Sequence, residues 1–293
     1  MLDGKVAIVT GAGRGLGRAE ALHLAGLGAR VVVNDVGANL DGTGASESLA
    51  HEVVEQILAA GGEAVAHHGD VADFEQAKVM IDTAIERFGG LDILVNNAGI
   101  LRDRMVFNMA EDEWDTVIRV HLKGHFCTTR HATAYWRARA KAGDMPDASI
   151  INTSSEAFLF GSPGQPNYAA AKAGIVGLTL ATAASCAKYG VRANAIAPRA
   201  ATRMTADMAM DEAQFAPENV APLVGYLASP AAARANGYVF VAYGGRVDVI
   251  AGPRLEERFQ TEGRWTSQDL AATMGPFFDK REPIADGFAM PFA

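Results

Sequence analysis

The chain has 293 residues, of which 49% are hydrophobic and 20% charged, which suits one large globular domain or two small ones. Its net charge of -8 and pI of about 5.4, without a basic run, make nucleic acid and anionic membranes poor candidate partners. The two cysteines, Cys127 and Cys186, form no CxxC motif, so we expect free thiols in a reducing cytosol and a cytoplasmic protein.

Short β-branched runs alternate with helical patterns along the chain. The predicted strands are 5–10, 30–35, 63–70, 91–97, 149–155, 192–198 and 238–245. The predicted helices are 18–28, 45–60, 73–88, 111–141 and 168–189. This alternation, with continuously apolar strands, predicts a doubly wound α/β fold in which helices cover both faces of a parallel sheet.

Four further stretches bear on the domain organisation. The Gly- and Ser-rich residues 36–48 are predicted to form a long surface loop. Residues 246–293 are too few to bury their own core, so we expect a C-terminal extension of a domain at 1–245 that packs on its own or a neighbouring subunit. The N-terminus MLDGKVAIVTGAG lacks a signal-peptide pattern, and the apolar stretch 174–187 is too short for a membrane span, which indicates a core helix.

The first predicted strand runs directly into TGAGRGLGR (10–18), and a helical pattern follows at once. Glycines at positions 11, 13, 15 and 17 allow a tight turn and a close approach of the backbone to phosphate oxygens. The helix N-terminus then offers free N–H groups and a partial positive charge to a pyrophosphate. This context predicts a dinucleotide site, and an ordinary Gly-rich turn is the alternative.

Asp35 ends the second predicted strand, eighteen residues beyond Gly17. An acid at this place can bind the adenosine ribose hydroxyls and repels a 2′-phosphate, which favours NAD over NADP. Arg14, inside the glycine loop, argues weakly for NADP unless its side chain is simply solvated. Asp35 is alternatively a turn-forming acid at a strand end.

Tyr168 and Lys172 stand four residues apart in NYAAAK, so they share one helix face. Ser155, thirteen residues before Tyr168, ends a predicted strand where a doubly wound sheet binds its ligand. A phenol needs a pKa shift of about 3 units, or about 4 kcal/mol, to work near neutral pH. A cation about 4 Å away supplies about 4 kcal/mol at an effective dielectric near 20. The three residues predict an acid–base site, and a surface Tyr–Lys pair is the alternative.

TGAGRGLG, NNAG (96–99), the Ser pair and YxxxK, in this order, resemble the short-chain dehydrogenase/reductase family over about residues 1–245. The resemblance implies a Rossmann-type sheet of seven parallel strands in a homodimer or homotetramer. It implies that Tyr168 is the general acid–base, that Lys172 lowers its pKa and holds the nicotinamide ribose, and that Ser155 positions the substrate oxygen. The implied cofactor contacts are Gly11, Arg14, Gly15, Leu16, Gly17, Asp35, Asp70, Val71, Asn97, Ala98, Gly99, Tyr168, Lys172, Pro198 and Thr202.

One branch of this family is closer. NDVGANLDGTG, NNAGILRDR, VHLKGHF, GQPNYAAAK and PENVAPLVGYLAS look like the (3R)-hydroxyacyl-CoA dehydrogenase domain of peroxisomal multifunctional enzyme type 2 and its bacterial relatives. In that branch His121 stands where the family commonly has Asn, and a proton relay and a structural role in a helix kink are both open. Arg199 replaces the family's usual Gly. The other histidines have no Cys or His partner at metal spacing, so no metal is proposed.

We therefore expect an NAD-dependent dehydrogenase that oxidises a 3-hydroxyacyl-CoA to the 3-oxoacyl-CoA, with this small molecule as its partner. A steroid or other bulky secondary-alcohol dehydrogenase, or a 3-oxoacyl reductase, would share every motif. A catalytically silent dinucleotide-binding regulator is a third alternative. Four arginines are candidates, by position only, for binding CoA phosphates, and a solvated surface role is equally open for them: Arg102, Arg104, Arg199 and Arg203.

Overall fold

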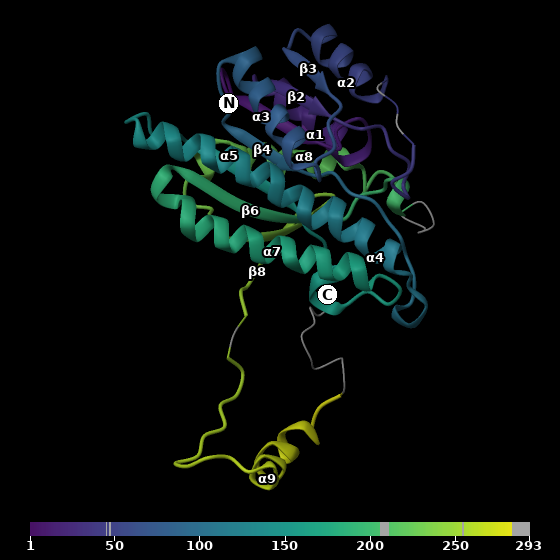
Figure 1. The fold of residues 1–293 in the computed structure, drawn as a ribbon, viewed down its shortest axis with the longest axis vertical. Coiled ribbons are helices and arrows are strands. Elements are labelled where there is room, and N and C mark those ends of the chain that lie inside the picture. Colours follow the sequence, from purple (N-terminus) through teal and green to yellow (C-terminus); the bar gives the residue numbers. More distant parts are fainter. Residues whose placement is uncertain (45, 47, 206–210, 254, 283–293) are drawn as a thin grey trace. The chain divides into compact units, whose positions relative to one another are not determined.

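The computed structural model describes residues 1–293 except 45, 47, 206–210, 254 and 283–293. At its centre lies an eight-stranded sheet in the order β3-β2-β1-β4-β5-β6-β7-β8 (Figure 1). The strands are β1 (Val6–Thr10), β2 (Arg30–Asn34), β3 (Ala64–His67), β4 (Ile93–Asn96), β5 (Ala148–Thr153), β6 (Val191–Pro198), β7 (Val239–Tyr243) and β8 (Arg246–Ile250). The first seven strands pair in parallel, as predicted.

β8 is the difference from the predicted sheet. It pairs antiparallel with β7, so that Tyr243 lies opposite Arg246, and Gly244 turns the chain in the left-handed conformation (φ 52°). The sheet domain was predicted to end at residue 245, whereas the sheet continues to Ile250. β8 leaves Val247 and Val249 exposed, so it lacks the continuous buried pattern by which the other strands were predicted.

Helices cover both faces of the sheet. The helices within residues 1–250 are α1 (Gly15–Gly26), α2 (Ser48–Ala59), α3 (Phe74–Phe88), α4 (Glu111–Ile118), α5 (Gly124–Lys141), α6 (Ala157–Phe160), α7 (Pro166–Cys186) and α8 (Ala221–Ala228). A ninth described helix, α9 (Ser267–Phe278), belongs to the segment that follows residue 250. Short 3-10 turns lie at Val106–Asn108, Ala187–Tyr189, Arg203–Thr205, Pro217–Asn219 and Pro230–Ala232. α6, α8 and α9 were not predicted; α8 is short and nearly all buried, so it shows no helical periodicity.

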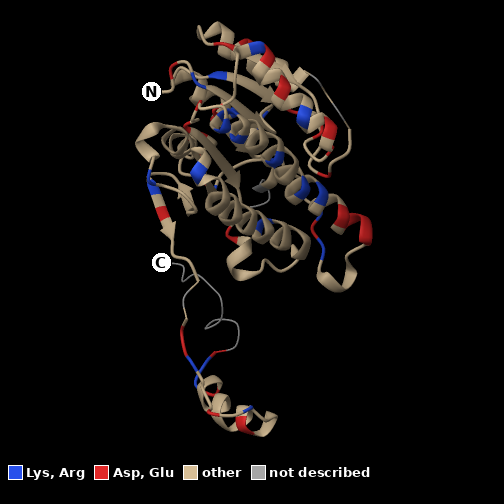
Figure 2. Ribbon diagram, turned by 60° about the vertical axis from the view of Figure 1, so that its left-hand side comes forward, with Lys and Arg blue, Asp and Glu red and all other residues tan. Residues whose placement is uncertain are grey.

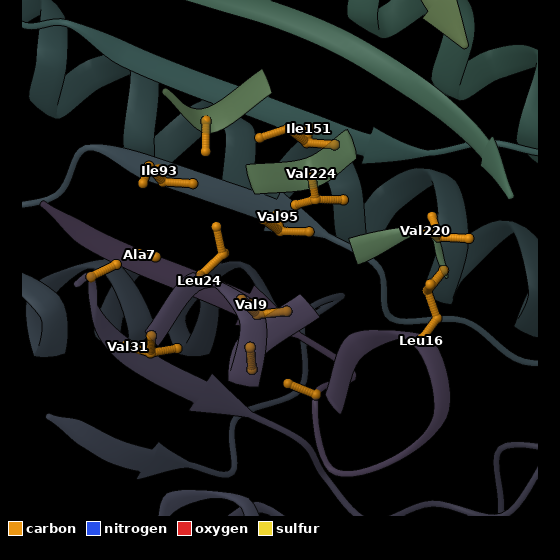
Figure 3. Close-up of a cluster of buried hydrophobic side chains, with 14 of the residues drawn as sticks. Ala7, Val9, Leu16, Leu24, Val31, Ile93, Val95, Ile151, Val220 and Val224 are labelled. Carbon is orange, nitrogen blue, oxygen red and sulfur yellow. The ribbon is translucent and has the colours of Figure 1, made fainter. Parts of the chain in front are cut away.

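Successive side chains of each strand point to opposite faces and build two cores. Ala7 and Val9 of β1 pack with α1, α2 and α8, and Figure 3 shows part of this cluster, including Leu24 and Val224. Val6 and Ile8, which alternate with them, pack with α3, α5 and α7 on the other face. Helices on both faces of a parallel sheet place the loops at the carboxyl ends of the strands around a common crevice.

The predicted helix 111–141 is one continuous helical segment, but its middle is not α-helical. α4 runs into a π-helical turn at Arg119–Lys123, and α5 follows directly. Figure 1 shows α4, α5 and α7 crossing the front of the sheet. π-helical turns are rare, and a large share of those known lie at functional sites. This one contains His121.

α7, with its 3-10 turn to Tyr189, is the one helix among the described residues that is long and apolar enough to cross a membrane by length and composition. A core helix passes the same test, and α7 packs on β5 and β6 with Ile175 and Thr179 fully buried. Within α7 the sequence has a single charged residue, Lys172. Acidic and basic side chains lie along other helices, such as α3 with its Glu, Asp, Lys and Arg residues (Figure 2).

The chain divides into two compact units, residues 1–250 and 251–293. In the second unit, Thr266 caps α9 by accepting a hydrogen bond from the Asp269 N–H (3.1 Å). The Phe277 ring lies edge-on to Phe259, and the Arg281 guanidinium lies 4.1 Å from the Phe277 ring centroid. That this extension packs on its own or a neighbouring subunit stays a prediction.

Candidate active site

Nearly all of the predicted site residues line one cavity of about 480 Å³. Its walls include the predicted residues Gly11, Arg14, Gly15, Leu16, Asp35, Asp70, Val71, Asn97, Ala98, Gly99, His121, Tyr168, Lys172, Pro198 and Thr202. Two predicted residues support this lining from outside it. Gly17 packs beneath the glycine loop, and Ser155 acts on the Tyr168 phenol, whose pKa it lowers. Segments far apart in the sequence thus meet at the carboxyl ends of the strands.

We call residues 11–17 together with Asp35 the glycine corner. Gly11 and Gly15 have positive φ angles (63° and 54°), which residues other than glycine rarely adopt. A Cβ on Gly17 would lie 2.4 Å from the Gly11 carbonyl oxygen. No side chain caps the N-terminus of α1, and Gly15 and Leu16 line the cavity, so the first N–H groups of this helix are available to an anion.

Asp35 is held at this corner by backbone N–H groups. Its Oδ2 accepts from the Gly13 N–H (2.8 Å) and its Oδ1 from the Gly37 N–H (2.6 Å). A Cβ on Gly13 would lie 2.8 Å from both Oδ2 of Asp35 and Cβ of Leu49, so a side chain here would displace its neighbours. Arg14 donates to the Ala38 carbonyl (3.4 Å) and lines the cavity on the same side. The corner therefore presents both an acid and a cation.

Tyr168, Lys172, Ser155 and His121 make up what we call the catalytic face. Lys172 is buried; its Nζ lies 5.2 Å from the Tyr168 ring centroid and donates to the Thr153 carbonyl (2.6 Å). The Ser155 Oγ accepts from the Ala157 N–H (3.2 Å), which leaves its own proton for the phenol. The helical spacing thus brings tyrosine and lysine together as predicted, at the end of β5.

Burial shifts the pKa values of Tyr168 and Lys172 in the directions that favour the neutral form of each side chain. It raises the pKa of Tyr168 to about 12, although the hydrogen bond from Ser155 opposes the rise. It lowers the pKa of Lys172 to about 7. Lys172 is predicted to lower the pKa of Tyr168, whereas the largest influence on this pKa within the protein is burial, which raises it. The cause is that burial disfavours the charged phenolate, just as it disfavours the charged ammonium ion of Lys172.

Asn167, the neighbour of Tyr168, was missed by sequence reasoning. Its buried amide donates to the carbonyls of Arg102 (2.9 Å) and Glu113 (3.0 Å) and accepts from the Tyr168 N–H (2.8 Å). It therefore fixes the first turn of α7 to the segment that follows β4. The quoted run NYAAAK contains this asparagine, but its partners lie more than fifty residues away and no spacing reveals them.

His121 lies in the cavity wall beside Tyr168, with the two rings edge-on and their centroids 5.2 Å apart. Its Nε2 contacts the Ile100 backbone, 2.8 Å from the carbonyl oxygen and 3.1 Å from the nitrogen, and its buried Nδ1 has no hydrogen-bond partner within the described residues. Burial, and then the charge of Lys172, lower its pKa well below the usual value. A relay that depends on titration of His121 near neutral pH therefore does not fit.

The structure explains why position 99, the last of the NNAG motif, is a glycine. A Cβ at this position would lie 2.3 Å from Cε1 of His121. The close approach of a backbone to the imidazole thus requires glycine. Asn97 supports the same loop, since its amide donates to the carbonyls of Thr10 (3.0 Å) and Gly11 (3.1 Å) and so joins the end of β4 to the glycine corner.

Three of the four arginines named for CoA phosphates are already engaged. Arg102 donates to the Asp41 carbonyl (2.8 Å), and Arg104 pairs with Glu113 (3.2 Å). Arg199 forms a bidentate ion pair with Glu156, at 2.6 and 2.7 Å. Arg203 instead lines the cavity, near Arg14 and Asp35.

The Glu156–Arg199 pair joins the ends of β5 and β6, two of the strand ends that carry predicted site residues. Glu156 directly follows Ser155, and Arg199 directly follows Pro198. The Arg199 guanidinium also lies 4.7 Å from the Tyr243 ring centroid at the end of β7. The replacement of the family's usual Gly by Arg199 thus introduces an ion pair beside the catalytic face.

The contribution of the loop after β2 to the cavity wall is a second feature that sequence reasoning missed. The predicted loop is a loop with exposed residues at 42–44, but one side of it lines the cavity through Val36, Ala38, Asn39, Leu40, Gly42 and Gly44. The Leu40 carbonyl accepts from the Leu101 N–H (3.0 Å). Arg119, also missed, lines the cavity and pairs with Asp70, the predicted adenine contact. These contacts join segments 49 to 61 residues apart, which no local pattern predicts.

The donor set fits a dinucleotide. Uncapped N–H groups at the start of α1 suit a pyrophosphate, and Asp35 suits vicinal ribose hydroxyls. Lys172 lies where it can donate to a second ribose. Among the described residues, no cluster of three or more His, Cys, Asp or Glu side chains has metal-site geometry.

Comparison with known proteins agrees with this geometry. The model of the short chain dehydrogenase family matches residues 5–213, and the chain belongs to this family. It is 51% identical to hydroxyacyl-CoA dehydrogenase ChsB1 of Mycobacterium tuberculosis over 297 residues, covering 96% of this chain and 91% of the relative. It is 46% identical to peroxisomal multifunctional enzyme type 2 of Drosophila melanogaster over 244 residues, covering 83% of this chain and 39% of that longer protein.

A solved structure shares the fold closely. The crystal structure of a short chain dehydrogenase from Mycobacterium avium superposes with a TM-score of 0.87 at 53% identity and covers 96% of this chain and 97% of the other. The predicted family and the predicted Rossmann-type α/β fold are therefore confirmed, apart from the additional antiparallel strand β8.

Proposed function

We propose that the protein is an NAD-dependent oxidoreductase that oxidises the hydroxyl group of a 3-hydroxyacyl-CoA to the 3-oxo thioester. The observation that carries this proposal is that Tyr168 and Lys172 line one cavity together with the glycine corner, with Ser155 beside Tyr168. The oxidant would be a nicotinamide dinucleotide, whose chemistry is the acceptance of a hydride.

The side chains of the catalytic face suit the proton half of this reaction. Ser155 orients the substrate hydroxyl, and Tyr168 accepts its proton as general base. With a pKa raised to about 12, Tyr168 needs added positive charge beside it before it can act as a base at neutral pH. Lys172, whose pKa of about 7 lets it exchange protons under these conditions, is the group of the protein that can supply that charge.

The substrate class is inferred from the relatives. The names of ChsB1 and of peroxisomal multifunctional enzyme type 2 point to acyl-CoA substrates and lipid metabolism. The preference for NAD is inferred from Asp35, which would repel a 2′-phosphate, although Arg14 and Arg203 lie near it. A cytoplasmic homodimer or homotetramer completes the proposal and is supported only by the composition and by the family.

One assay series tests these inferences together. Turnover is measured with NAD and NADP on 3-hydroxyacyl-CoA thioesters of increasing chain length, and on a hydroxysteroid without a CoA group. We expect the highest kcat/KM with NAD and a CoA thioester. Higher kcat/KM with the hydroxysteroid would favour the steroid alternative, and a preference for NADP would contradict the role given to Asp35. Dinucleotide binding without turnover of any substrate would favour a regulator.

A further inference from the structure

Two histidines outside the cavity approach each other at their ring nitrogens. His51 lies on α2 and is exposed, and His68 follows β3 and is partly buried. Their Nε2 atoms are 3.3 Å apart, and their ring centroids are 5.1 Å apart with an angle of 42° between the rings. The two residues are separated by seventeen positions, so only the pairing of α2 with the end of β3 brings them together.

The tautomer of His68 follows from its other nitrogen. Its Nδ1 lies 3.2 Å from the backbone carbonyl oxygen of Asp35. A carbonyl oxygen can only accept, so Nδ1 carries the proton and Nε2 presents a lone pair toward His51. An imidazole that donates one N–H to a backbone carbonyl and keeps its second nitrogen free is the usual arrangement of a metal-binding histidine.

The distances also match a shared metal ion. Two imidazole nitrogens that each lie about 2.0–2.1 Å from a tetrahedral Zn²⁺ are about 3.3–3.4 Å apart, and their ring centroids are about 5.2 Å apart. The observed separations are 3.3 and 5.1 Å. Nitrogens that point straight at each other in a linear hydrogen bond would leave the ring centroids farther apart for the same Nε2 distance.

We propose that His51 and His68 bind one divalent transition-metal ion through their Nε2 atoms, with water as the remaining ligands. Imidazole suits Zn²⁺, Ni²⁺ and Cu²⁺, and it is a poor ligand for Mg²⁺. His51 is exposed, so its proton can move to Nδ1, where solvent can accept it. No third His, Cys, Asp or Glu joins the pair among the described residues, so this is an open two-ligand site rather than a closed structural centre.

The test uses untagged, chelator-treated protein and isothermal titration with ZnCl₂, NiCl₂, MnCl₂ and MgCl₂. We expect one Zn²⁺ or Ni²⁺ per chain, weaker binding of Mn²⁺ and none of Mg²⁺. His51→Ala and His68→Gln should each weaken Zn²⁺ binding at least tenfold. Glu52→Gln, an exposed change next to His51, is the matched control and should bind as the wild type does.

A second readout is the melting temperature with and without Zn²⁺. The ion should raise it in the wild type and in Glu52→Gln but not in His51→Ala, because a ligand stabilises the state that binds it. Absence of saturable Zn²⁺ binding in the wild type, or equal Zn²⁺ affinity in wild type and His51→Ala, would overturn the proposal. The pair would then be only a hydrogen bond between two imidazoles.

Discussion

The glycine corner and the catalytic face share one cavity but are built in different ways. At the glycine corner, backbone atoms define the shape, since Gly11 and Gly15 have positive φ angles and Gly17 leaves no room for a Cβ. At the catalytic face, side chains define the chemistry, because burial shifts the pKa values of Tyr168 and Lys172. Added volume should therefore disturb the corner, and changed chemistry should disturb the face.

The largest effect is expected at the catalytic face. Tyr168→Phe keeps the ring and removes the group that exchanges the proton, so turnover should fall about 10²–10⁴-fold. Dinucleotide affinity, measured by titration calorimetry, should change little because the glycine corner is untouched. If chemistry limits the rate and the variant keeps most of its turnover, Tyr168 is not the base.

The glycine corner should respond to a single added carbon. Gly17→Ala places its Cβ 2.4 Å from the Gly11 oxygen, and rigid backbone cannot move aside as a side chain can. We expect at least tenfold weaker dinucleotide binding and a loss of about 1–3 kcal/mol in the free energy of unfolding.

Gly26→Ala is the matched control for this prediction. It adds the same carbon to α1 at a place with no atom within 4 Å. Alanine is a better helix former than glycine, so the control should be neutral or slightly stabilising. Equal losses in both variants would show that helix α1 tolerates no change, and the argument from close approach would fail.

A buried acid on α1, Glu20, should make the stability of the protein depend on pH. Glu20 is fully buried, and neither of its carboxyl oxygens has a hydrogen-bond partner within the described residues. Burial raises its pKa from 4.5 to about 8. Between these values the folded state binds a proton that the unfolded state has lost, so the free energy of unfolding falls as pH rises.

Glu20→Leu should abolish this pH dependence. At pH 8 the variant should be more stable than the wild type by a few kcal/mol at most, since each unit of pKa shift is worth about 1.4 kcal/mol. At pH 5 the advantage should be much smaller. Denaturant unfolding at both pH values measures this, with the exposed change Glu52→Gln as the control; an advantage that is independent of pH would contradict the explanation.

Breaking the Glu156–Arg199 ion pair should lower turnover less than the loss of the Tyr168 hydroxyl does. Glu156 has 12% of its side chain exposed, so Arg199→Met leaves a poorly solvated carboxylate next to Ser155. We expect about a tenfold fall in kcat with little change in dinucleotide affinity, and partial recovery in Glu156→Gln/Arg199→Met. Lys78→Gln, which breaks an exposed ion pair, is the control and should be silent. No recovery in the double variant would mean that the charges act separately.

The smallest effect is expected from His121. Its pKa lies well below the usual value, so its titration cannot shape the pH–rate profile between about 6 and 8. His121→Ala should slow the reaction a few-fold at most and leave the shape of that profile unchanged. A profile altered in this range would restore the titrating relay that the sequence suggested.

The sequence by itself determined the fold class, the glycine loop and the Tyr168–Lys172 pair. Alternating strands and helices, the glycine loop and YxxxK are local patterns, because backbone geometry and helical periodicity act over a few residues. The same patterns placed seven of the eight strands and brought Tyr168 beside Lys172. Where local periodicity was weak, as in the exposed strand β8, the prediction failed.

Only the tertiary structure decided how these residues are protonated and what they touch. The raised pKa of Tyr168 and the lowered pKa of His121 arise from burial, which depends on the packing of distant segments. The partners of Arg199 and the approach of His51 to His68 are likewise long-range contacts. A chain's local spacing carries no information about which remote groups will share a desolvated volume, and desolvation controls the chemistry of this site.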